Sequence, residues 1–411
     1  MRGGSEKYCF ALSEALKDSG DETVFFAMKD EKNFPCSQEE FFIDNAGTSG
    51  GLKSKLKLVF NMAYNKQAYK KLYALLKKEN PDFAVLNLIH KQITCSVIDA
   101  IRDYGKETGR YIPIFWACHD YIFVCPSYLF LDGKGEICEK CLSGDYRNCV
   151  KNNCVKGSRA LSFLSYKDAV NIKKHGWYDK VDAYICPSEF ILGKLKEGGF
   201  TKSELVKITN LMPQSDFSEE YKGKRGTYFL YFGRLSKEKG VDTLIKAFGE
   251  SGINDAELII AGRGPCEEEL RDLAENYDKK ISFCGYKSGR ELKQIIGNAS
   301  FAVMSSEWYE NCPYGILEAK ALGKPVICSK IGGMKELVTD GEDGFLFASE
   351  EELKEKLNKA VNISDEEYEK MSEKAYLDAK TRCDGKKYVR KIKEIYERVK
   401  KLKAENGGVN V

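Results

Sequence analysis

Two short segments of this chain combine charged side chains with glycines at a spacing that suits phosphate binding. The first, residues 233–240, reads GRLSKEKG and directly follows an apolar, β-rich run. An arginine offers phosphate oxygens a planar fork and a lysine offers a compact charge, so Arg234 and Lys239 are candidates to hold a diphosphate. Such charge-assisted hydrogen bonds contribute about 1.5–3 kcal/mol each. The alternative is an ordinary solvated turn.

The second segment, residues 307–319, reads EWYENCPYGILEA and leads from an apolar run into a helix. A helix N-terminus exposes unpaired N–H groups and a partial positive charge, which suit a diphosphate. Glu310 and Glu318 flank this terminus, where a carboxylate can accept hydrogen bonds from sugar or ribose hydroxyls. The alternative is that Glu318 only complements the helix dipole and that Glu310 is solvent-exposed. Taken alone, the segment favours that alternative.

Both segments lie in a region where β-rich runs alternate with helical stretches, as in a parallel sheet wrapped by helices. Glycines follow several of the strands, at the end where an open α/β sheet presents its loops to ligand. The expected strands are 228–232, 257–261, 281–284, 301–304, 326–329 and 344–347, and the expected final helices are 351–361, 364–379 and 385–402.

The N-terminal half repeats the pattern less cleanly and predicts a second doubly wound domain. Its expected strands are 23–27, 83–88, 113–118, 182–186 and 205–209. We expect a Rossmann-like domain over 1–212, a second over 213–384, and a last helix over 385–405. The chain begins at Gly3-Gly4, which looks like the loop that follows a first strand, so we expect that strand to be missing. We expect the reading frame to be truncated; the alternative is a domain that opens without this edge strand.

The two charged segments together resemble glycosyltransferase family 4, because Gly-Arg-x₄-Lys-Gly follows one strand and Glu-x₇-Glu follows a later strand of the same sheet. Four further segments fall where that family's pattern puts them: 262–265 (GRGP), 283–286 (FCGY), 321–327 (ALGKPVI) and 332–338 (GGMKELV). The resemblance covers most of 227–347 and, more faintly, the N-terminal half. It implies a GT-B fold, in which two Rossmann-like α/β domains face each other across a cleft. It also implies a donor nucleotide held mainly by the C-terminal domain, retention of anomeric configuration, and no catalytic metal. The last helix, 385–405, would cross back to the N-terminal domain, as in GT-B enzymes.

The resemblance also implies roles for single residues. Arg234 and Lys239 would grip the donor diphosphate, Glu318 would hold the ribose, and Glu310 would contact the transferred sugar. His119 looks like the family's histidine near the reacting carbon; the alternative is a core position. A leaving phosphate oxygen would take the acceptor's proton, while Glu310 as a covalent nucleophile is a second route. The other expected donor contacts are Gly3, Gly4, Gly233, Arg263, Gly264, Tyr314, Gly315 and Ile316.

An insert over 121–157, in the acceptor-side N-terminal domain, concentrates cysteine. The spacing Cys-x₂-Cys suits chelation, and four thiolates make a closed structural zinc site, so we predict structural zinc here. Free thiols and a redox pair are the alternatives. No histidine set with an open position suggests a catalytic zinc. Related family members with such inserts are, as far as the resemblance goes, polysaccharide-assembly enzymes. The cysteines are Cys125, Cys138, Cys141, Cys149 and Cys154.

Composition narrows the class of protein and its surroundings. A formal net charge of +3 argues against a nucleic-acid binder. The apolar runs are shorter than the roughly 20 residues that span a bilayer, and the N-terminus has no signal peptide, so we expect a cytoplasmic protein. Residues 46–78 hold eight lysines and no acidic residue. This amphipathic segment predicts peripheral binding to the anionic inner face of the plasma membrane; the alternative is a solvated helix face.

The sequence therefore predicts a retaining hexosyltransferase that moves a sugar from a nucleotide-diphosphate sugar to a glycan or lipid-linked acceptor in cell-surface polysaccharide synthesis. Two other readings remain open. One is a catalytically inactive GT-B scaffold subunit, and the other is a nucleotide-sugar epimerase. Their products separate them, because transfer needs an acceptor, epimerisation does not, and a scaffold forms no product.

Overall fold

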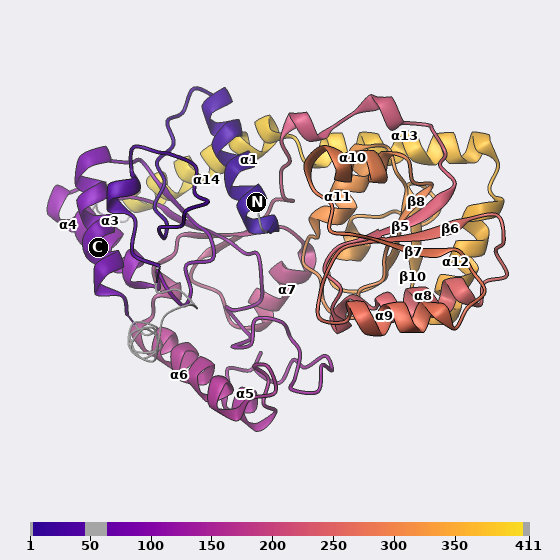
Figure 1. The fold of residues 1–411 in the computed structure, drawn as a ribbon. Coiled ribbons are helices and arrows are strands. Elements are labelled where there is room, and N and C mark those ends of the chain that lie inside the picture. The colour runs from indigo at the N-terminus through magenta and orange to yellow at the C-terminus, as the bar shows by residue number, and fades with distance from the viewer. Residues whose placement is uncertain (1–2, 46–63, 406–411) are drawn as a thin grey trace.

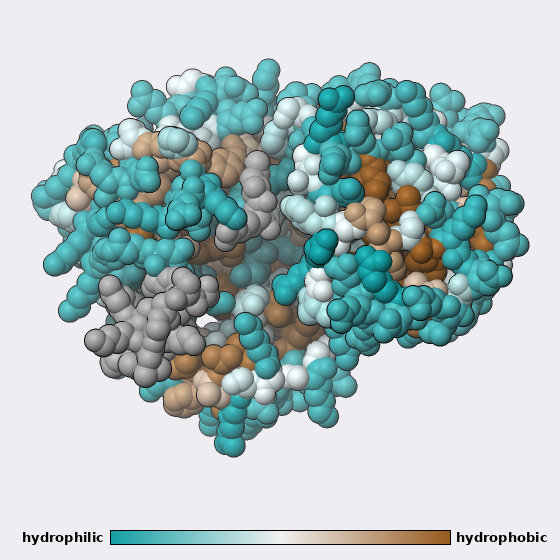
Figure 2. All heavy atoms as spheres, viewed as in Figure 1, coloured by the Kyte–Doolittle hydropathy of each residue, from teal (hydrophilic) through white to brown (hydrophobic). Residues whose placement is uncertain are grey.

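The structure is a computed structural model and describes residues 3–45 and 64–405, which form two α/β lobes (Figure 1). Each lobe has its own parallel sheet. Figure 2 shows the surface hollowed between the lobes. The predicted fold class, two doubly wound α/β domains, is confirmed.

The C-terminal lobe contains a six-stranded parallel sheet in the order β10-β9-β8-β5-β6-β7. All six strands expected from the sequence are present. Every residue of the central strands β8 and β9 is buried, because helices cover both faces of the sheet. The strands are β5 (Tyr228–Phe232), β6 (Glu257–Ala261), β7 (Ile281–Gly285), β8 (Phe301–Met304), β9 (Val326–Ser329) and β10 (Gly344–Phe347).

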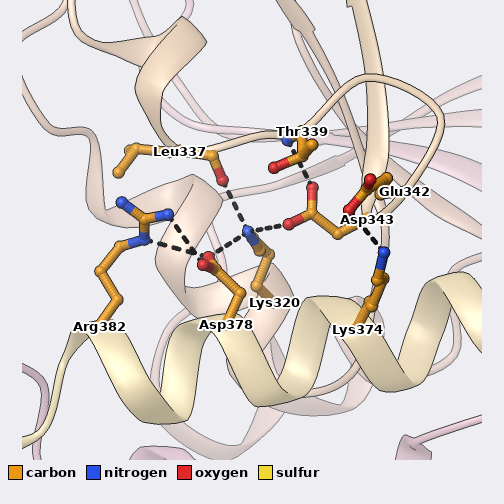
Figure 3. A network of polar contacts seen from close by, with 8 residues as sticks. All are labelled: Lys320, Leu337, Thr339, Glu342, Asp343, Lys374, Asp378 and Arg382. Carbon is orange, nitrogen blue, oxygen red and sulfur yellow. Dashed lines mark hydrogen bonds and ion pairs between the residues drawn. The ribbon is translucent and has the colours of Figure 1, made fainter.

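Helices α8 (Val241–Gly249), α9 (Glu267–Glu275), α10 (Gly289–Gly297), α11 (Tyr314–Ala321), α12 (Glu350–Asn362) and α13 (Asp365–Arg382) surround this sheet. A buried ammonium group joins α11 to α13 (Figure 3). Lys320 Nζ donates to the carbonyl of Leu337 at 2.7 Å and pairs with Asp343 at 2.8 Å and Asp378 at 2.5 Å. These contacts tie α11 to α13 and to the loop that precedes β10.

The N-terminal lobe contains four parallel strands in the order β1-β2-β3-β4. They are β1 (Ala84–Leu86), β2 (Ile114–Ala117), β3 (Ala183–Cys186) and β4 (Glu204–Lys207). The helices are α1 (Gly4–Asp18), α3 (Lys66–Glu79), α4 (Ser96–Thr108), α5 (Arg147–Lys151), α6 (Arg159–His175) and α7 (Glu189–Glu197). Short 3-10 turns, η1 to η6, lie at Glu39–Phe41, Tyr178–Lys180, Gln214–Asp216, Glu219–Tyr221, Lys237–Lys239 and Met334–Glu336.

The strand expected at 23–27 is wrong. This part of the chain has no strand, and only an isolated bridge between Met28 and Ile43 follows it. Phe25 packs beside α1 instead: its ring lies 6.4 Å from that of Phe10 in α1 and 5.0 Å from that of Phe34, measured between centroids. Residues with high β-propensity pack well on a half-buried surface, and here they do so although their backbone pairs with no strand.

The last helix, α14 (Gly385–Glu405), leaves the C-terminal lobe and runs along the N-terminal lobe beside α1 (Figure 1). The hydroxyls of Tyr388 and Tyr8 lie 2.6 Å apart in the buried contact between these helices. Further along α14, Arg398 pairs with Glu204 of β4 at 2.6 Å. The C-terminal end of the described chain is therefore packed on the lobe that carries its beginning.

Helix α3 holds the described part of the lysine-rich segment 46–78. Its apolar face, which includes Leu72, Leu75 and Leu76, is buried in the core of the N-terminal lobe. Lys53, Lys55 and Lys57 lie outside the described residues. In the parts of the chain that the structure describes, no helix has the length and apolarity needed to cross a bilayer.

Candidate functional site

The order in which the chain adds strands to the sheet of the C-terminal lobe reverses between β5 and β8. The chain adds β6 and β7 on one side of β5, then returns to place β8, β9 and β10 on the other. Loops that leave adjacent strands in opposite directions open a crevice at the carboxyl ends of the strands, and ligands bind there in open α/β sheets. The charged segment 233–240 follows β5, and the segment with Glu310 follows β8.

Lys239 and Glu310 meet in an ion pair at this point. Glu310 Oε1 also accepts hydrogen bonds from Ser306 Oγ and Trp308 Nε1, each at 3.1 Å. The Lys239 ammonium lies 5.3 Å from the centroid of a Trp308 ring. The two charged side chains are only 22% and 12% exposed, so solvent screens the pair weakly. Three donors on one oxygen fix the orientation of this carboxylate.

Glycines allow the neighbouring loops to touch. A Cβ on Gly262 would lie 1.9 Å from the carbonyl oxygen of Gly233, and one on Gly264 would lie 2.0 Å from that of Leu235. The amide of Leu235 donates to the carbonyl of Arg263 at 3.0 Å. The loop after β6 is thus bonded to the loop after β5. Arg234 and Arg263 are both exposed on these joined loops.

Helix α11 begins with Tyr314 and presents Glu318 one turn later. Tyr314 is 9% exposed, and its hydroxyl donates to the carbonyl of Leu211 at 3.1 Å, while Ile316 is fully buried. A Cβ on Gly4 would lie 2.9 Å from the Tyr314 ring. Gly4, in the first turn of α1, therefore lies against the start of α11, whereas a Cβ on Gly3 would meet no atom within 4 Å. A Cβ on Gly315 would lie 2.9 Å from the Met304 side chain of β8. Tyr314 and Ile316 reach the core in this arrangement.

Lys7 is a residue of this site that the sequence analysis missed. From α1 it reaches across the lobes and pairs with Glu318 and with Asp216, each at 2.6 Å. Lys7 and Glu318 are 311 positions apart, so no local pattern marks the contact. Its position three residues after Gly3-Gly4 in the sequence is the single available signal.

His119 follows β2 on the facing lobe. Its Nε2 lies 2.8 Å from Oδ1 of Asn87, and its ring lies 4.8 Å from that of Tyr8, between centroids. An amide oxygen only accepts, so Nε2 carries the hydrogen and Nδ1 is the acceptor nitrogen. Burial lowers the pKa of His119 to about 4, which keeps the imidazole neutral at neutral pH.

Asp120, beside His119, was not singled out from the sequence. Its Oδ1 accepts from the amide of Ile122 at 3.1 Å. Burial raises the pKa of Asp120 to about 6, although that hydrogen bond and the charge of Lys91 both lower it. A strand-end carboxyl with this pKa is a functional-site candidate, because such shifts concentrate at sites.

Hydrogen bonds between the lobes bring the two halves of the site together. Asn311, next to Glu310, donates to the carbonyl of Cys118, next to His119, at 2.7 Å, and it accepts from Ser188 at 2.7 Å. Glu336 accepts from the first two amides of α7 at 2.8 and 2.9 Å and pairs with Lys207 at 2.9 Å. The strand end with His119 therefore faces the loop with Glu310.

The cysteine-rich insert packs against that same loop. Tyr309 lies 6.0 Å from Phe130 of the insert and 4.6 Å from Phe190 of α7, between ring centroids. Glu139, also in the insert, pairs with Lys194 of α7 at 2.9 Å. The insert thus forms one wall beside the residue that precedes Glu310.

The five cysteines of the insert are free thiols that lie near one another. Burial, together with the neighbouring Cys125, Cys154 and Cys138, raises the pKa of Cys141 to about 12. A hydrogen bond between the Cys149 and Cys154 thiols raises the pKa of Cys149 and lowers that of Cys154. Within residues 3–45 and 64–405, no group of three or more His, Cys, Asp or Glu side chains is arranged to hold a metal. The zinc site stays a prediction.

Comparison with known proteins extends this picture. The family model described as glycosyl transferases group 1 matches residues 214–378. A glycosyltransferase of Methanocaldococcus jannaschii designated MJ1069 is 31% identical over 203 residues, which are 48% of this chain and 51% of that protein. The alignments with the first three curated relatives span 30%, 51% and 59% of those relatives' lengths.

Solved structures match almost the whole chain. Sucrose-phosphate synthase from Thermosynechococcus elongatus superposes with a TM-score of 0.66 at 16% identity, over 97% of this chain and 94% of that one. The Anabaena protein Alr3699/HepE, solved in complex with UDP and glucose, gives a TM-score of 0.60 at 16% identity, over 98% of this chain and 96% of that one. Residues 214–378 therefore match the glycosyl transferases group 1 family, within a chain that has the GT-B fold.

Proposed function

We propose that this protein is a retaining glycosyltransferase that moves a hexose from a nucleotide-diphosphate sugar to a glycan or lipid-linked acceptor. One observation carries the proposal. Lys239 and Glu310 form an ion pair where the strand order of the C-terminal sheet reverses, between β5 and β8. The pair lies beside the start of α11, which carries Glu318. This is the position where an open α/β sheet binds ligands, and a cation, a helix start and two carboxylates suit a diphosphate joined to two sugars.

In this proposal each charged group has one task. Lys239 and Arg234 stabilise negative charge on the departing diphosphate, which is electrostatic catalysis by groups already in place. Glu318 receives the ribose hydroxyls, and Glu310 contacts the transferred sugar. His119 approaches from the facing lobe as a neutral imidazole whose Nδ1 can accept one hydrogen bond, and it adds no charge near the reacting carbon.

The solved relatives support a nucleotide-sugar donor. The Anabaena protein was solved with UDP and glucose, and a Staphylococcus aureus TarM variant with a TM-score of 0.51 was solved with UDP. The acceptor in our proposal is a growing glycan or a lipid-linked sugar of cell-surface polysaccharide. Its site lies on the N-terminal lobe, near His119 and the insert. We place the enzyme in the cytoplasm, in contact with the inner face of the plasma membrane.

Thermal unfolding in the presence of nucleoside diphosphates and their sugars tests the donor site. We expect one base to give a saturable rise in Tm, because a ligand that binds only the folded chain stabilises it. The rise should shrink in Glu318→Ala and in Lys239→Ala. Lys374→Ala, on the outer surface of α13, should respond as the wild type does.

Product analysis separates the three readings of this fold. Incubation with the stabilising nucleotide sugar and an oligosaccharide acceptor should release nucleoside diphosphate only when the acceptor is present. Glu310→Gln should lower that rate by at least about tenfold, since a charge-assisted hydrogen bond is worth about 1.5–3 kcal/mol. Epimerised sugar without acceptor would identify an epimerase. Binding without either product would identify a scaffold.

A further inference from the structure

The charge of Lys7 lies between two carboxylates at the junction of the lobes. Its ammonium is 2.6 Å from Glu318 Oε1 on α11 and 2.6 Å from Asp216 Oδ2 on η3, and the three side chains are 16%, 24% and 19% exposed. It also lies 5.4 Å from the centroid of the Tyr314 ring. One cation of the N-terminal lobe therefore contacts two residues of α11, Tyr314 and Glu318, and also Asp216 of η3.

This ammonium stays charged in its position. Burial lowers the pKa of Lys7, but the attraction of Glu318 and Asp216, with their hydrogen bonds, raises it above the usual 10.5. A buried charge without partners would cost several kcal/mol, so the two carboxylates are what keep Lys7 in place. The contact is thus fixed by chemistry on both lobes.

The contact also restricts Glu318. A glutamate on a helix surface has several rotamers of similar energy, and ordering such a side chain costs up to about 2 kcal/mol of conformational entropy. Lys7 holds one carboxylate oxygen of Glu318 in a single position. A ligand that hydrogen-bonds to the other oxygen then meets a carboxylate that is already oriented.

We propose that Lys7 is a positioning residue of the donor site. It holds the Glu318 carboxylate for the ribose of a nucleoside diphosphate and links the occupied site to the N-terminal lobe through α1. This inference rests on the proposed function. Lys7 itself acts through Glu318, and it touches neither the diphosphate nor the transferred sugar.

The chain offers a matched control for Lys7. Lys293 of α10 pairs with the same Asp216, through Oδ1 at 3.3 Å, and is 39% exposed. It donates to the carbonyl of Ser215 at 2.5 Å, and within residues 3–45 and 64–405 no hydrogen bond or ion pair joins it to Glu318. Loss of Lys293 removes a cation next to Asp216 and leaves the Lys7–Glu318 pair intact.

Isothermal titration of the full chain with UDP, GDP and ADP tests the proposal. The proteins are wild type, Lys7→Met, Lys7→Arg, Lys293→Met, Glu318→Gln and the double variant Lys7→Met/Glu318→Gln. For the nucleotide that the wild type binds, we expect Kd to rise about tenfold in Lys7→Met and Glu318→Gln and to stay within about twofold in Lys293→Met, as expected when one charge-assisted contact is removed. Lys7→Arg should bind more tightly than Lys7→Met, because it restores the charge.

The double variant distinguishes positioning from general weakening. If Lys7 acts through Glu318, the double variant should bind no more weakly than Glu318→Gln alone. Multiplying effects, or a Lys7→Met protein that binds as the wild type does, would overturn the inference while leaving the proposed function standing. Failure of the wild type to bind any of the three nucleotides would overturn the proposed function, and the inference with it. Circular dichroism of each variant confirms that the compared proteins are folded.

Discussion

Glu310 shows how a residue can be ready for a ligand before the ligand arrives. All three donors to its Oε1 come from the C-terminal lobe: Lys239, Ser306 and Trp308. The same lobe supplies Glu318, but its orientation depends on Lys7 of the other lobe. The groups that orient Glu310, which we propose contacts the sugar, therefore come from one lobe. The orientation of Glu318, which we propose contacts the ribose, depends on both lobes.

His119 gives a prediction about pH. Its pKa is lowered by burial to about 4 in the folded chain, compared with about 6.5 in an unfolded one. A group with a depressed folded pKa contributes stability that is present above the unfolded value and is lost as pH falls toward the folded value. We therefore expect the free energy of unfolding to fall between about pH 6.5 and pH 4, and to fall less steeply in His119→Asn.

Urea unfolding of both proteins across this pH range measures the effect. The comparison isolates His119, because His90, whose pKa burial lowers to about 3, is present in both proteins. Equal slopes for wild type and variant would show that folding does not lower the pKa of His119.

The residues that sequence reasoning could name are those that follow strands in a compact pattern. Arg234, Lys239, Glu310 and Glu318 stand close to the ends of β5 and β8, and a parallel sheet brings such ends to one edge. Lys7 could not be found this way, because its partners come from a helix and a turn of the other lobe. The bond from Asn311 to Cys118 is equally remote, at 193 positions.

At the scale of elements, α11 depends on Lys320. Replacing Lys320 by methionine leaves the carboxylates of Asp343 and Asp378 without their shared ammonium (Figure 3). Breaking a buried ion pair from one side costs about 3–5 kcal/mol, so we expect Lys320→Met to lower the free energy of unfolding by that amount. Chemical denaturation followed by circular dichroism provides the measurement.

The control for this prediction lies in the same figure. Lys374 pairs with Glu342 at 2.5 Å, but both side chains are more than half exposed, at 56% and 54%. Exposed pairs contribute about 1 kcal/mol or less, so Lys374→Met should be nearly neutral. A similar loss in both variants would mean that burial of Lys320 adds nothing to the stability of α11.

The insert gives the second prediction at this scale. If it binds zinc, protein purified without chelator should contain about one zinc per chain, and Cys138→Ser should lose it. Cys284→Ser, in β7 of the other lobe, should keep it. Metal analysis by mass spectrometry decides the matter. Protein without zinc would favour free thiols or a redox pair, for which the hydrogen-bonded Cys149 and Cys154 are the closest candidates.

Element prediction succeeded where packing follows the local pattern. The strands of the C-terminal lobe are short, apolar and bounded by glycine, so their sequence and their burial agree. Residues 23–27 are also short and apolar, but Phe25 packs against Phe10 of α1 and Phe26 against the core of the N-terminal lobe. A segment forms a strand only where a second strand lies beside it, and the sequence of one segment does not show which segment that is.

At the scale of the whole molecule, contacts between the lobes surround the proposed site. Asn311, Glu336 and Lys7 each cross from one lobe to the other, and α14 returns to pack beside α1. The return of α14 was expected from the family resemblance. The side-chain contacts of Asn311, Glu336 and Lys7 could not be predicted from composition or periodicity, since each joins segments that are far apart in the chain. These contacts also hold His119 of one lobe opposite Glu310 of the other, so that both side chains can act on one substrate.

The lysines of α3 yield the last prediction, which concerns the surface of the whole molecule. Since the apolar face of α3 is buried in its own lobe, the described helix can offer a membrane only its charge. Lys66 and Lys70 are exposed, and a lysine near an anionic surface contributes about 1 kcal/mol to binding. We expect sedimentation with phosphatidylserine vesicles, a weaker signal with neutral vesicles, and loss of binding in high salt.

Lys66→Glu/Lys70→Glu should bind less than the matched pair Lys354→Glu/Lys374→Glu on the C-terminal lobe, because only the first pair lies in the lysine-rich segment. Binding that ignores salt and anionic lipid would remove the membrane from the proposed function and leave the acceptor in solution.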